Sequence, residues 1–150
     1  MSPQARDPGY EARVRDSFAR QAAMHTIGAE VAHVAPGEVD IRLPFRADLT
    51  QQHGFLHAGI LGAVADSAAG YAAYTLMPAE AAVLSVEYKL NLMAPAAGEA
   101  FVARGRVKKA GRTLTVCTAD VFALQSGQER LVATMQATMM TVMDRPGLSG

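Results

Sequence analysis

The stretch from Ala58 to Met77 constrains this sequence most, because its 20 consecutive residues contain a single charged side chain, Asp66. A run of this length is long enough to cross a bilayer as a helix. Its composition argues against a membrane span, since it is mostly alanine and glycine and its carboxylate lies near the middle, where a bilayer would make it most costly. No lysine or arginine cluster flanks it. We therefore predict a helix over residues 57–77 that is buried on most sides.

Length and charge exclude several classes of protein. The chain has 150 residues, enough for one domain with a core of its own. Lys+Arg and Asp+Glu number 14 each, and this balance argues against a nucleic-acid binder or a polybasic membrane-surface protein. One cysteine, Cys117, allows no internal disulfide, and the first 30 residues lack the apolar segment of a signal peptide. These features predict a reducing, cytoplasmic compartment.

The order of periodic segments predicts the architecture. Residues 10–24 have the pattern of an amphipathic helix, and two strands over residues 27–34 and 39–43 precede the apolar helix. Four further strands follow over residues 84–92, 99–107, 113–122 and 131–142. We predict an α+β fold in which a curled antiparallel sheet wraps around one long helix and a partner chain covers the rest. The expected division is an N-terminal helical extension (1–26), the main domain (27–143) and a flexible tail (144–150).

The most informative motif begins at Gln51 and continues through His53-Gly54-Phe55-Leu56-His57-Ala58-Gly59. This H-G-x-L-H-x-G pattern, with Asp66 nine residues after the second histidine, resembles the hotdog-fold thioesterases. The similarity is to the branch with the PaaI-type acyl-CoA thioesterases and 4-hydroxybenzoyl-CoA thioesterase, and it covers residues 27–142. Ala58 stands where the family usually has a second glycine, but alanine keeps the backbone N–H that this position supplies.

The resemblance implies hydrolysis of an aryl or short- to medium-chain acyl-CoA thioester without a metal or redox cofactor. In that case Asp66 is the nucleophile or general base and the N–H of Ala58 polarises the carbonyl. Gln51 and Ser85 orient the reacting groups, and His57 fixes the start of the helix. Asp66 also stands out by itself, since a carboxylate in an apolar helix is costly unless it is hydrogen-bonded or functional. A structural acid satisfied by a serine or a backbone group is the alternative.

Helix geometry predicts that the site needs two chains. Ala58 and Asp66 are eight residues apart, which is about 12 Å along a helix. His57 and Asp66 lie on opposite faces at about 100° per residue. One thioester can therefore contact both Ala58 and Asp66 only if the start of the helix in one chain lies beside Asp66 of another chain. We expect a homodimer as the minimal active unit, and the resemblance implies a homotetramer.

Coenzyme A carries phosphates, so a neutral protein must gather positive charge to hold it. We expect the coenzyme to contact Gly59 at the helix start and five cations that follow closely in sequence: Arg104, Arg106, Lys108, Lys109 and Arg112. An ordinary solvated strand face is the alternative. For the acyl group, we expect a pocket at the helix–helix interface, where small residues leave room and where Tyr74, Met77 and Met93 line it.

Two other functions remain open. A hotdog module could bind acyl-CoA without hydrolysing it, although simple binding would not require Asp66. A hotdog dehydratase or hydratase would place its histidine and acid differently. Metal binding is not expected, because His53 and His57 have no third ligand nearby in the sequence.

Overall fold

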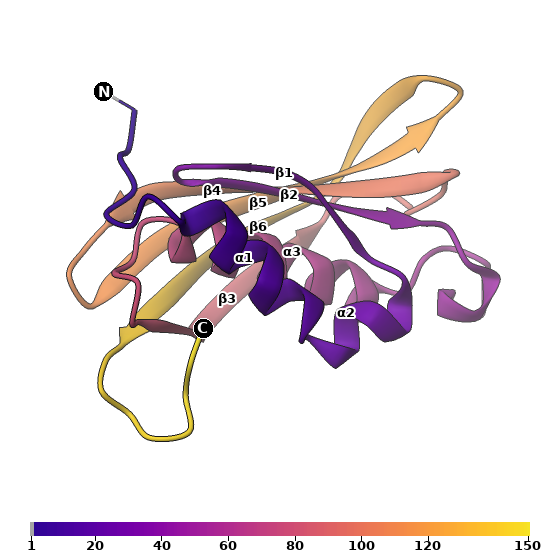
Figure 1. The fold of residues 1–150 in the computed structure, drawn as a ribbon. Helices are drawn as coiled ribbons and strands as arrows, with labels where there is room; N and C mark the ends of the chain where they lie inside the picture. Colours follow the sequence, from indigo (N-terminus) through magenta and orange to yellow (C-terminus); the bar gives the residue numbers. More distant parts are fainter. Residues whose placement is uncertain (1) are drawn as a thin grey trace.

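The computed structural model describes residues 2–150, and its main elements follow the predicted order of two strands, one long helix and four strands. The elements are α1 (Tyr10–Ala19), α2 (Ala22–Ile27), β1 (Glu30–Ala35), β2 (Glu38–Pro44), the 3-10 turn η1 (Ala47–Leu49), α3 (Ala58–Tyr74), β3 (Ala82–Leu92), β4 (Ala100–Ala110), β5 (Leu114–Gln125) and β6 (Gln128–Val142). Figure 1 shows the sheet extending across α3, with α1 and α2 beside that helix. The predicted α+β class is confirmed.

The six strands form one antiparallel sheet in the order β1-β2-β4-β5-β6-β3. Consecutive hairpins join β4, β5 and β6, whereas α3 separates β2 from β3 in the chain. This topology leaves β1 and β3 as the two edges. α3 contacts five strands of the sheet, the edge strand β3 among them.

Small residues let α3 lie close to its own sheet. A Cβ added at Gly105 on β4 would lie 2.2 Å from the carbonyl oxygen of Ala68, so only glycine permits this approach. Gly62 and Gly70 likewise face the sheet, where Leu90 of β3 packs over Gly62. This differs from the expectation that the small residues serve a helix–helix contact, because the sheet of the same chain already uses this space.

The helix predicted over residues 10–24 is divided in two. Gln21 has an extended backbone (φ −80°, ψ 94°) between α1 and α2. In one straight helix, the side chains of Val14 and Met24, ten residues apart, would point about 80° away from each other. The break lets both face the core, where they are 0% and 2% exposed. The break also brings the side chain of Gln21 to Ser67 of α3.

Other boundaries also differ from the sequence pattern. The segment expected to begin a strand at Ile27 instead ends α2, because Gly28 takes a left-handed conformation (φ 79°) that stops the helix. The first strand then begins at Glu30. The long helix ends at Tyr74 rather than near residue 77, with Thr75 as its C-cap.

Arg13 ties the N-terminal extension to the end of α3. Its guanidinium donates to the carbonyl oxygens of Tyr74 (3.0 Å), Met77 (3.0 Å) and Pro78 (2.5 Å). The carbonyl oxygens of Tyr74 and Pro78 also accept from the backbone N–H groups of Met77 and Ala81, so Arg13 adds a second donor to each. The guanidinium also lies 4.3 Å from the centre of the Tyr74 ring, and Asp7 approaches it at 3.3 Å. One side chain thus satisfies several partly buried carbonyls.

We expect Arg13→Met to lower the free energy of unfolding by about 2–4 kcal/mol, because it removes three hydrogen bonds that a charged donor makes to partly buried carbonyls. Arg15→Met is the matched control on the same helix, since Arg15 is exposed and contacts only Glu11. That control should change stability by less than about 0.5 kcal/mol. Urea unfolding of both variants checks the difference, and equal effects would contradict a capping role for Arg13.

Within residues 2–150, no helix combines the length and the hydropathy that crossing a membrane requires. Residues 144–150 form neither helix nor strand. This tail returns to the body of the fold, where the guanidinium of Arg20 donates to the carbonyl oxygen of Gly150.

Candidate active site

The first turn of α3 presents an open backbone donor. His57 is the N-cap, and its Nδ1 accepts a hydrogen bond from the N–H of Gly59 at 2.8 Å. The backbone N–H of Gly59 is therefore already hydrogen-bonded within the first turn of α3. Within residues 2–150, the backbone N–H of Ala58 has no hydrogen-bond acceptor. Ala58 thus offers a donor at the positive end of the helix dipole.

Gln51 lies beside this donor and shapes the preceding loop. Its side-chain oxygen accepts from the N–H of His53 at 2.5 Å, and its backbone N–H donates to Phe55 at 2.8 Å. Gly54 completes the loop with φ 83°. The side-chain oxygen of Gln51 is therefore engaged, and its amide nitrogen is the group that remains for a ligand.

These residues line a hollow that we call the Ala58 pocket. Its volume is about 380 Å³. It lies between the start of α3 and the segment that leaves β3, and its walls are mainly apolar: Gln51, Phe55, Leu56, Ala58, Leu61, Leu92, Met93, Ala94, Pro95 and Ala96. Met93 thus lies beside the helix start, whereas Tyr74 and Met77 lie near the other end of α3, with Arg13.

Asp66 faces β3 from the middle of α3. The hydroxyl of Ser85 donates to its Oδ1 at 2.7 Å. Burial raises the pKa of the Asp66 carboxyl above its ordinary value, and the hydrogen bond from Ser85 opposes this rise. Such a carboxyl can hold or release a proton closer to neutral pH than an exposed one.

A bulge in β3 makes this contact possible. Strict alternation would place Ser85 on the opposite face from Tyr88 and Leu90. The pairing of β3 with β6 shifts between Ser85 and Glu87, so one extra residue reverses the alternation at that point. Ser85 consequently faces α3, and the Leu90 side chain and Tyr88 hydroxyl also face it at Gly62.

We expect Ser85→Ala to shift the acidic limb of the pH–activity profile to higher pH. The substitution removes the hydrogen bond that favours the ionised carboxylate, so the pKa of Asp66 rises further. Ser85→Thr keeps the hydroxyl and should retain the wild-type profile. Initial rates measured from pH 4 to 9 check this, and superimposable Ala and wild-type profiles would contradict it.

A second hollow, which we call the Asp66 pocket, has a volume of about 340 Å³. It shares no residue with the Ala58 pocket. Residues of α1, the α1–α2 break, α3, β3 and the C-terminal tail line it: Ser17, Arg20, Gln21, Asp66, Ser67, Gly70, Tyr71, Val83, Ser85, Ser149 and Gly150. The contribution of the N-terminal extension has no signal in the sequence, because neither glycine nor proline marks the break at Gln21.

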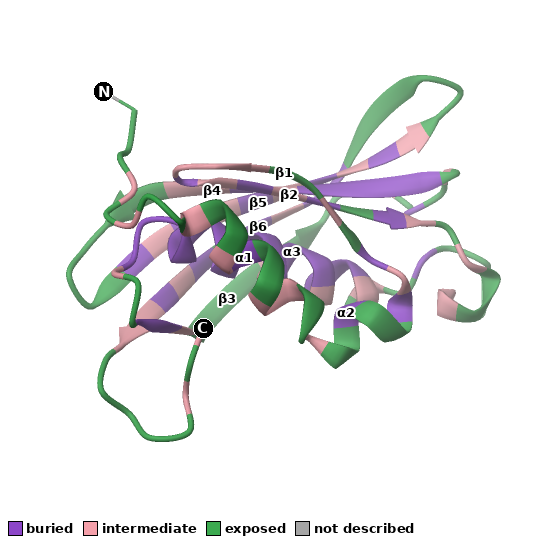
Figure 2. Cartoon of the chain, viewed as in Figure 1, coloured by how far each residue is buried: buried purple, intermediate pink, exposed green. Residues whose placement is uncertain are grey.

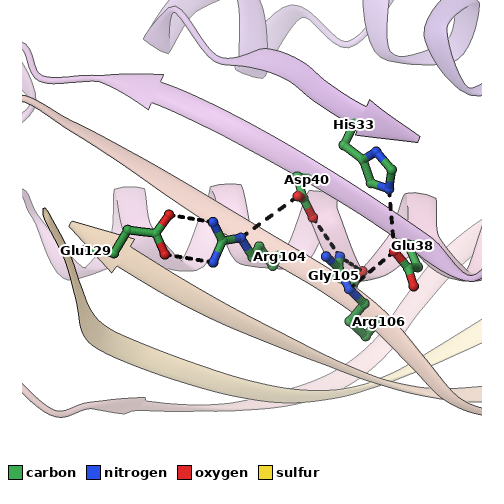
Figure 3. Close-up of polar contacts among 7 residues, drawn as sticks. All are labelled: His33, Glu38, Asp40, Arg104, Gly105, Arg106 and Glu129. Atoms are coloured by element: carbon green, nitrogen blue, oxygen red, sulfur yellow. Dashed lines mark hydrogen bonds and ion pairs between the residues drawn. The ribbon is translucent and has the colours of Figure 1, made fainter. Parts of the chain in front are cut away.

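The basic residues expected to bind coenzyme A do not lie together as free cations. Arg104 and Arg106 lie on the outer face of the sheet within a row of ion pairs, which Figure 3 shows. Arg104 binds both carboxylate oxygens of Glu129, at 2.9 and 2.6 Å, and Arg106 contacts Asp40 at 2.6 Å. This pairing neutralises two of the five predicted cations. The ion pairs found in the described part of the chain involve none of the other three: Lys108, Lys109 and Arg112.

Cys117 is a buried free thiol that lines neither pocket. Burial raises the pKa of the Cys117 thiol to about 12, so it stays protonated and is a poor nucleophile. Across residues 2–150, no three His, Cys, Asp or Glu side chains lie close enough to share a metal ion.

Comparison with known proteins assigns the family. The sequence profile described as the thioesterase superfamily matches residues 53–129, just over half of the chain and including the segment from His53 to Asp66. The chain belongs to the thioesterase superfamily. Its sheet and central helix are those of the hotdog fold, which confirms the predicted resemblance.

Solved structures of this superfamily are similar along most of the chain. A thioesterase family protein from Silicibacter pomeroyi is 56% identical, has a TM-score of 0.89, and aligns over 90% of this chain and 99% of its own. The E. coli PaaI protein of the phenylacetic acid degradation operon has a TM-score of 0.80 at 18% identity, covering 89% of this chain and 93% of its own. The second of these similarities shows the fold alone.

Among curated sequences, a protein of Saccharolobus solfataricus that is provisionally named an esterase is 29% identical over 90 residues. The match covers 60% of this chain and 64% of that relative. The chain thus spans slightly less than two thirds of the length of the curated relatives it matches.

Proposed function

We propose that this protein hydrolyses acyl-CoA thioesters to a free acid and coenzyme A, at a site built from two copies of the chain. The observation that carries the proposal is the carboxylate of Asp66. It lies in the middle of an apolar helix, burial raises its pKa, and Ser85 holds it at 2.7 Å beside a pocket of about 340 Å³. A purely structural acid would not need an adjoining pocket.

The separation of the two pockets supports a two-chain site. Asp66 and the free N–H of Ala58 are eight residues apart on one helix, about 12 Å, and their pockets share no residue. An oxyanion donor must lie about 3 Å from the oxygen that it stabilises. A second copy must therefore bring its own Ala58 pocket to Asp66.

Strand β3 is suited to join the two copies. Val83 and Ser85, near its start, line the Asp66 pocket, whereas Leu92, at its end, lines the Ala58 pocket. If β3 pairs antiparallel with its counterpart about a two-fold axis near Tyr88, the Ser85 end of one strand lies beside the end of the partner's strand. Each Asp66 pocket then meets an Ala58 pocket of the other chain, and two equivalent sites form.

The exposed side chains of β3 favour a second copy of the chain as the partner of this strand. Figure 2 shows β3 exposed along most of its length. Large apolar side chains on it are unusually accessible, with Val86 at 53%, Tyr88 at 49% and Leu92 at 55% exposure. Proteins seldom leave a long apolar edge strand unpaired, because it would aggregate. Pairing with a second copy covers this edge and satisfies its backbone groups.

The mechanism follows from this arrangement. The thioester carbonyl oxygen accepts a hydrogen bond from the N–H of Ala58, which stabilises the negative charge that develops there. Asp66 either attacks the carbonyl carbon and forms an anhydride that water opens, or takes a proton from water as the water attacks. In both routes the carbon–sulfur bond breaks and the sulfur leaves with its electron pair. It takes its proton from solvent in the first route, and in the second it takes the proton that Asp66 removed from water. Gln51 orients the carbonyl, and His57 keeps the helix start in place.

The remaining predicted contacts are those between basic side chains and the phosphates of coenzyme A. Lys108, Lys109 and Arg112 are exposed and are the cations available to bind its phosphates. Arg104 and Arg106 would first have to give up their carboxylate partners. Assembly of two dimers into a homotetramer stays a prediction.

The direct test is release of free thiol from a panel of aryl, short-chain and medium-chain acyl-CoAs, together with the mass of the protein in solution. We expect turnover of some members of the panel by an assembly of at least two chains. Saturable binding without thiol release would contradict hydrolysis and favour an acyl-CoA-binding module. Full turnover by a monomer would contradict the two-chain site.

A further inference from the structure

Hydrogen-bonding side chains line the wall of the Asp66 pocket that the N-terminal extension provides. The amide nitrogen of Gln21 lies 3.1 Å from the hydroxyl oxygen of Ser67, and the Ser17 and Tyr71 hydroxyl oxygens lie 3.1 Å apart. All four residues line the pocket that Asp66 and Ser85 also line. The proposed hydrolysis uses none of them, so their chemistry needs a separate explanation.

The break between α1 and α2 brings Gln21 to this wall. The extended backbone of Gln21 comes directly after the last turn of α1, and its side chain reaches the middle of α3. Ser67, the residue it contacts, follows Asp66 directly. A continuous helix over residues 10–24 would lack this extended residue. The pocket wall therefore depends on a feature of the tertiary structure rather than on a motif.

These groups retain capacity for a ligand. A glutamine amide has two N–H donors and an oxygen with two lone pairs, and Ser67 uses only part of this capacity. Burial raises the pKa of the Tyr71 phenol, which therefore stays protonated and able to donate. A purely hydrocarbon acyl group would cover these polar groups without forming hydrogen bonds to them, and such burial is unfavourable.

We propose that Gln21 and Tyr71 are specificity-determining residues that select thioesters whose acyl group carries a neutral hydrogen-bonding substituent, such as a hydroxyl, at the end away from the sulfur. The inference rests on the proposed thioester hydrolysis. It assigns the N-terminal extension a role in substrate choice, because the α1–α2 break supplies Gln21, and Ser17 of α1 holds the hydroxyl of Tyr71 on α3.

A pair of substrates that differ in one hydroxyl tests this role. Hexanoyl-CoA and 6-hydroxyhexanoyl-CoA have the same chain length, and we expect wild-type kcat/KM to favour the hydroxylated thioester by about threefold to tenfold. Gln21→Leu and Tyr71→Phe should each reduce this preference, mainly by raising KM for the hydroxylated thioester. For hexanoyl-CoA, which has no terminal hydroxyl, both variants should change kcat/KM by a smaller factor than for the hydroxylated thioester.

Controls separate selectivity from loss of structure. Gln128→Leu makes the same change at an exposed position where β6 begins, and it should leave the preference unchanged. Tyr71→Phe removes only a hydroxyl from a ring that packs against Phe18 and Tyr74, so it should fold even if Gln21→Leu does not.

The possible outcomes distinguish the two proposals. Failure of the wild type to release thiol from any acyl-CoA would overturn the hydrolase function itself. Hydrolysis of both thioesters with equal kcat/KM, or a preference that Tyr71→Phe leaves intact, would overturn only the selectivity. A stronger preference for a terminal carboxylate would also overturn the choice of a neutral substituent, and would indicate Arg20 instead.

Discussion

Asp66→Asn is expected to lower kcat for acyl-CoA hydrolysis by about a thousandfold, because the amide can neither attack the carbonyl nor accept a proton from water. Asparagine has nearly the same shape and can still accept the hydrogen bond from Ser85. Thiol-release assays under saturating substrate measure the effect. Asp16→Asn makes the same change at an exposed position of α1 and should leave kcat unchanged.

The stability of the Asp66→Asn variant should move in the opposite direction to its activity. Burial raises the pKa of Asp66 in the folded protein above its value in the unfolded chain, so folding favours the protonated form. Stability is therefore lost as pH rises from the unfolded pKa through the folded pKa. At neutral pH, Asp66→Asn should unfold at a temperature no lower than that of the wild type. A variant that keeps full turnover would remove Asp66 from the mechanism.

Mixed assemblies of Ala58→Pro and Asp66→Asn chains are expected to recover activity that each variant lacks alone. Proline is well tolerated at the first residue of a helix, and His57 before it has an extended backbone (φ −62°, ψ 137°) that suits a following proline. Ala58→Pro thus removes the proposed oxyanion donor without disturbing α3. Alone, it should lower kcat by about a hundredfold to a thousandfold.

In a mixed dimer, one site combines the intact Ala58 of one chain with the intact Asp66 of the other. Dimers purified through two different tags should therefore show about half of wild-type activity, since one of two sites is intact. Mixed dimers that stay inactive would contradict a site shared between chains. Ala47→Pro, at the first residue of η1, is the matched control and should keep wild-type turnover.

Local periodicity predicted the main elements where residue types repeat regularly. Residues 84–92 alternate apolar and polar side chains and α3 is almost entirely apolar, so the first pattern predicted a strand and the second a buried helix. The break at Gln21 had no such signal, since Arg20 and Gln21 are ordinary helix residues. There, contacts with distant segments accompany the break: Gln21 reaches Ser67, and Val14 and Met24 both join the core.

The candidate site also has some features that local sequence predicted and others that it did not. The motif from Gln51 to Gly59 predicted where α3 starts, because its residues are adjacent in sequence. The bulge in β3 was not predictable, since nothing in the sequence shows where one extra residue reverses the face of Ser85. Neither were the acidic partners of Arg104 and Arg106, which come from strands distant in sequence.

The sequence by itself determined the family, the order of the elements and an isolated acid in an apolar helix. Each of these depends on residue types and on spacings along one segment. Only the tertiary structure decided that Ser85 reaches Asp66, that Gln21 and Tyr71 line the same pocket, and that this pocket is separate from the one at Ala58. These relations join segments far apart in the chain, and they follow from how the sheet packs on α3 rather than from any local propensity.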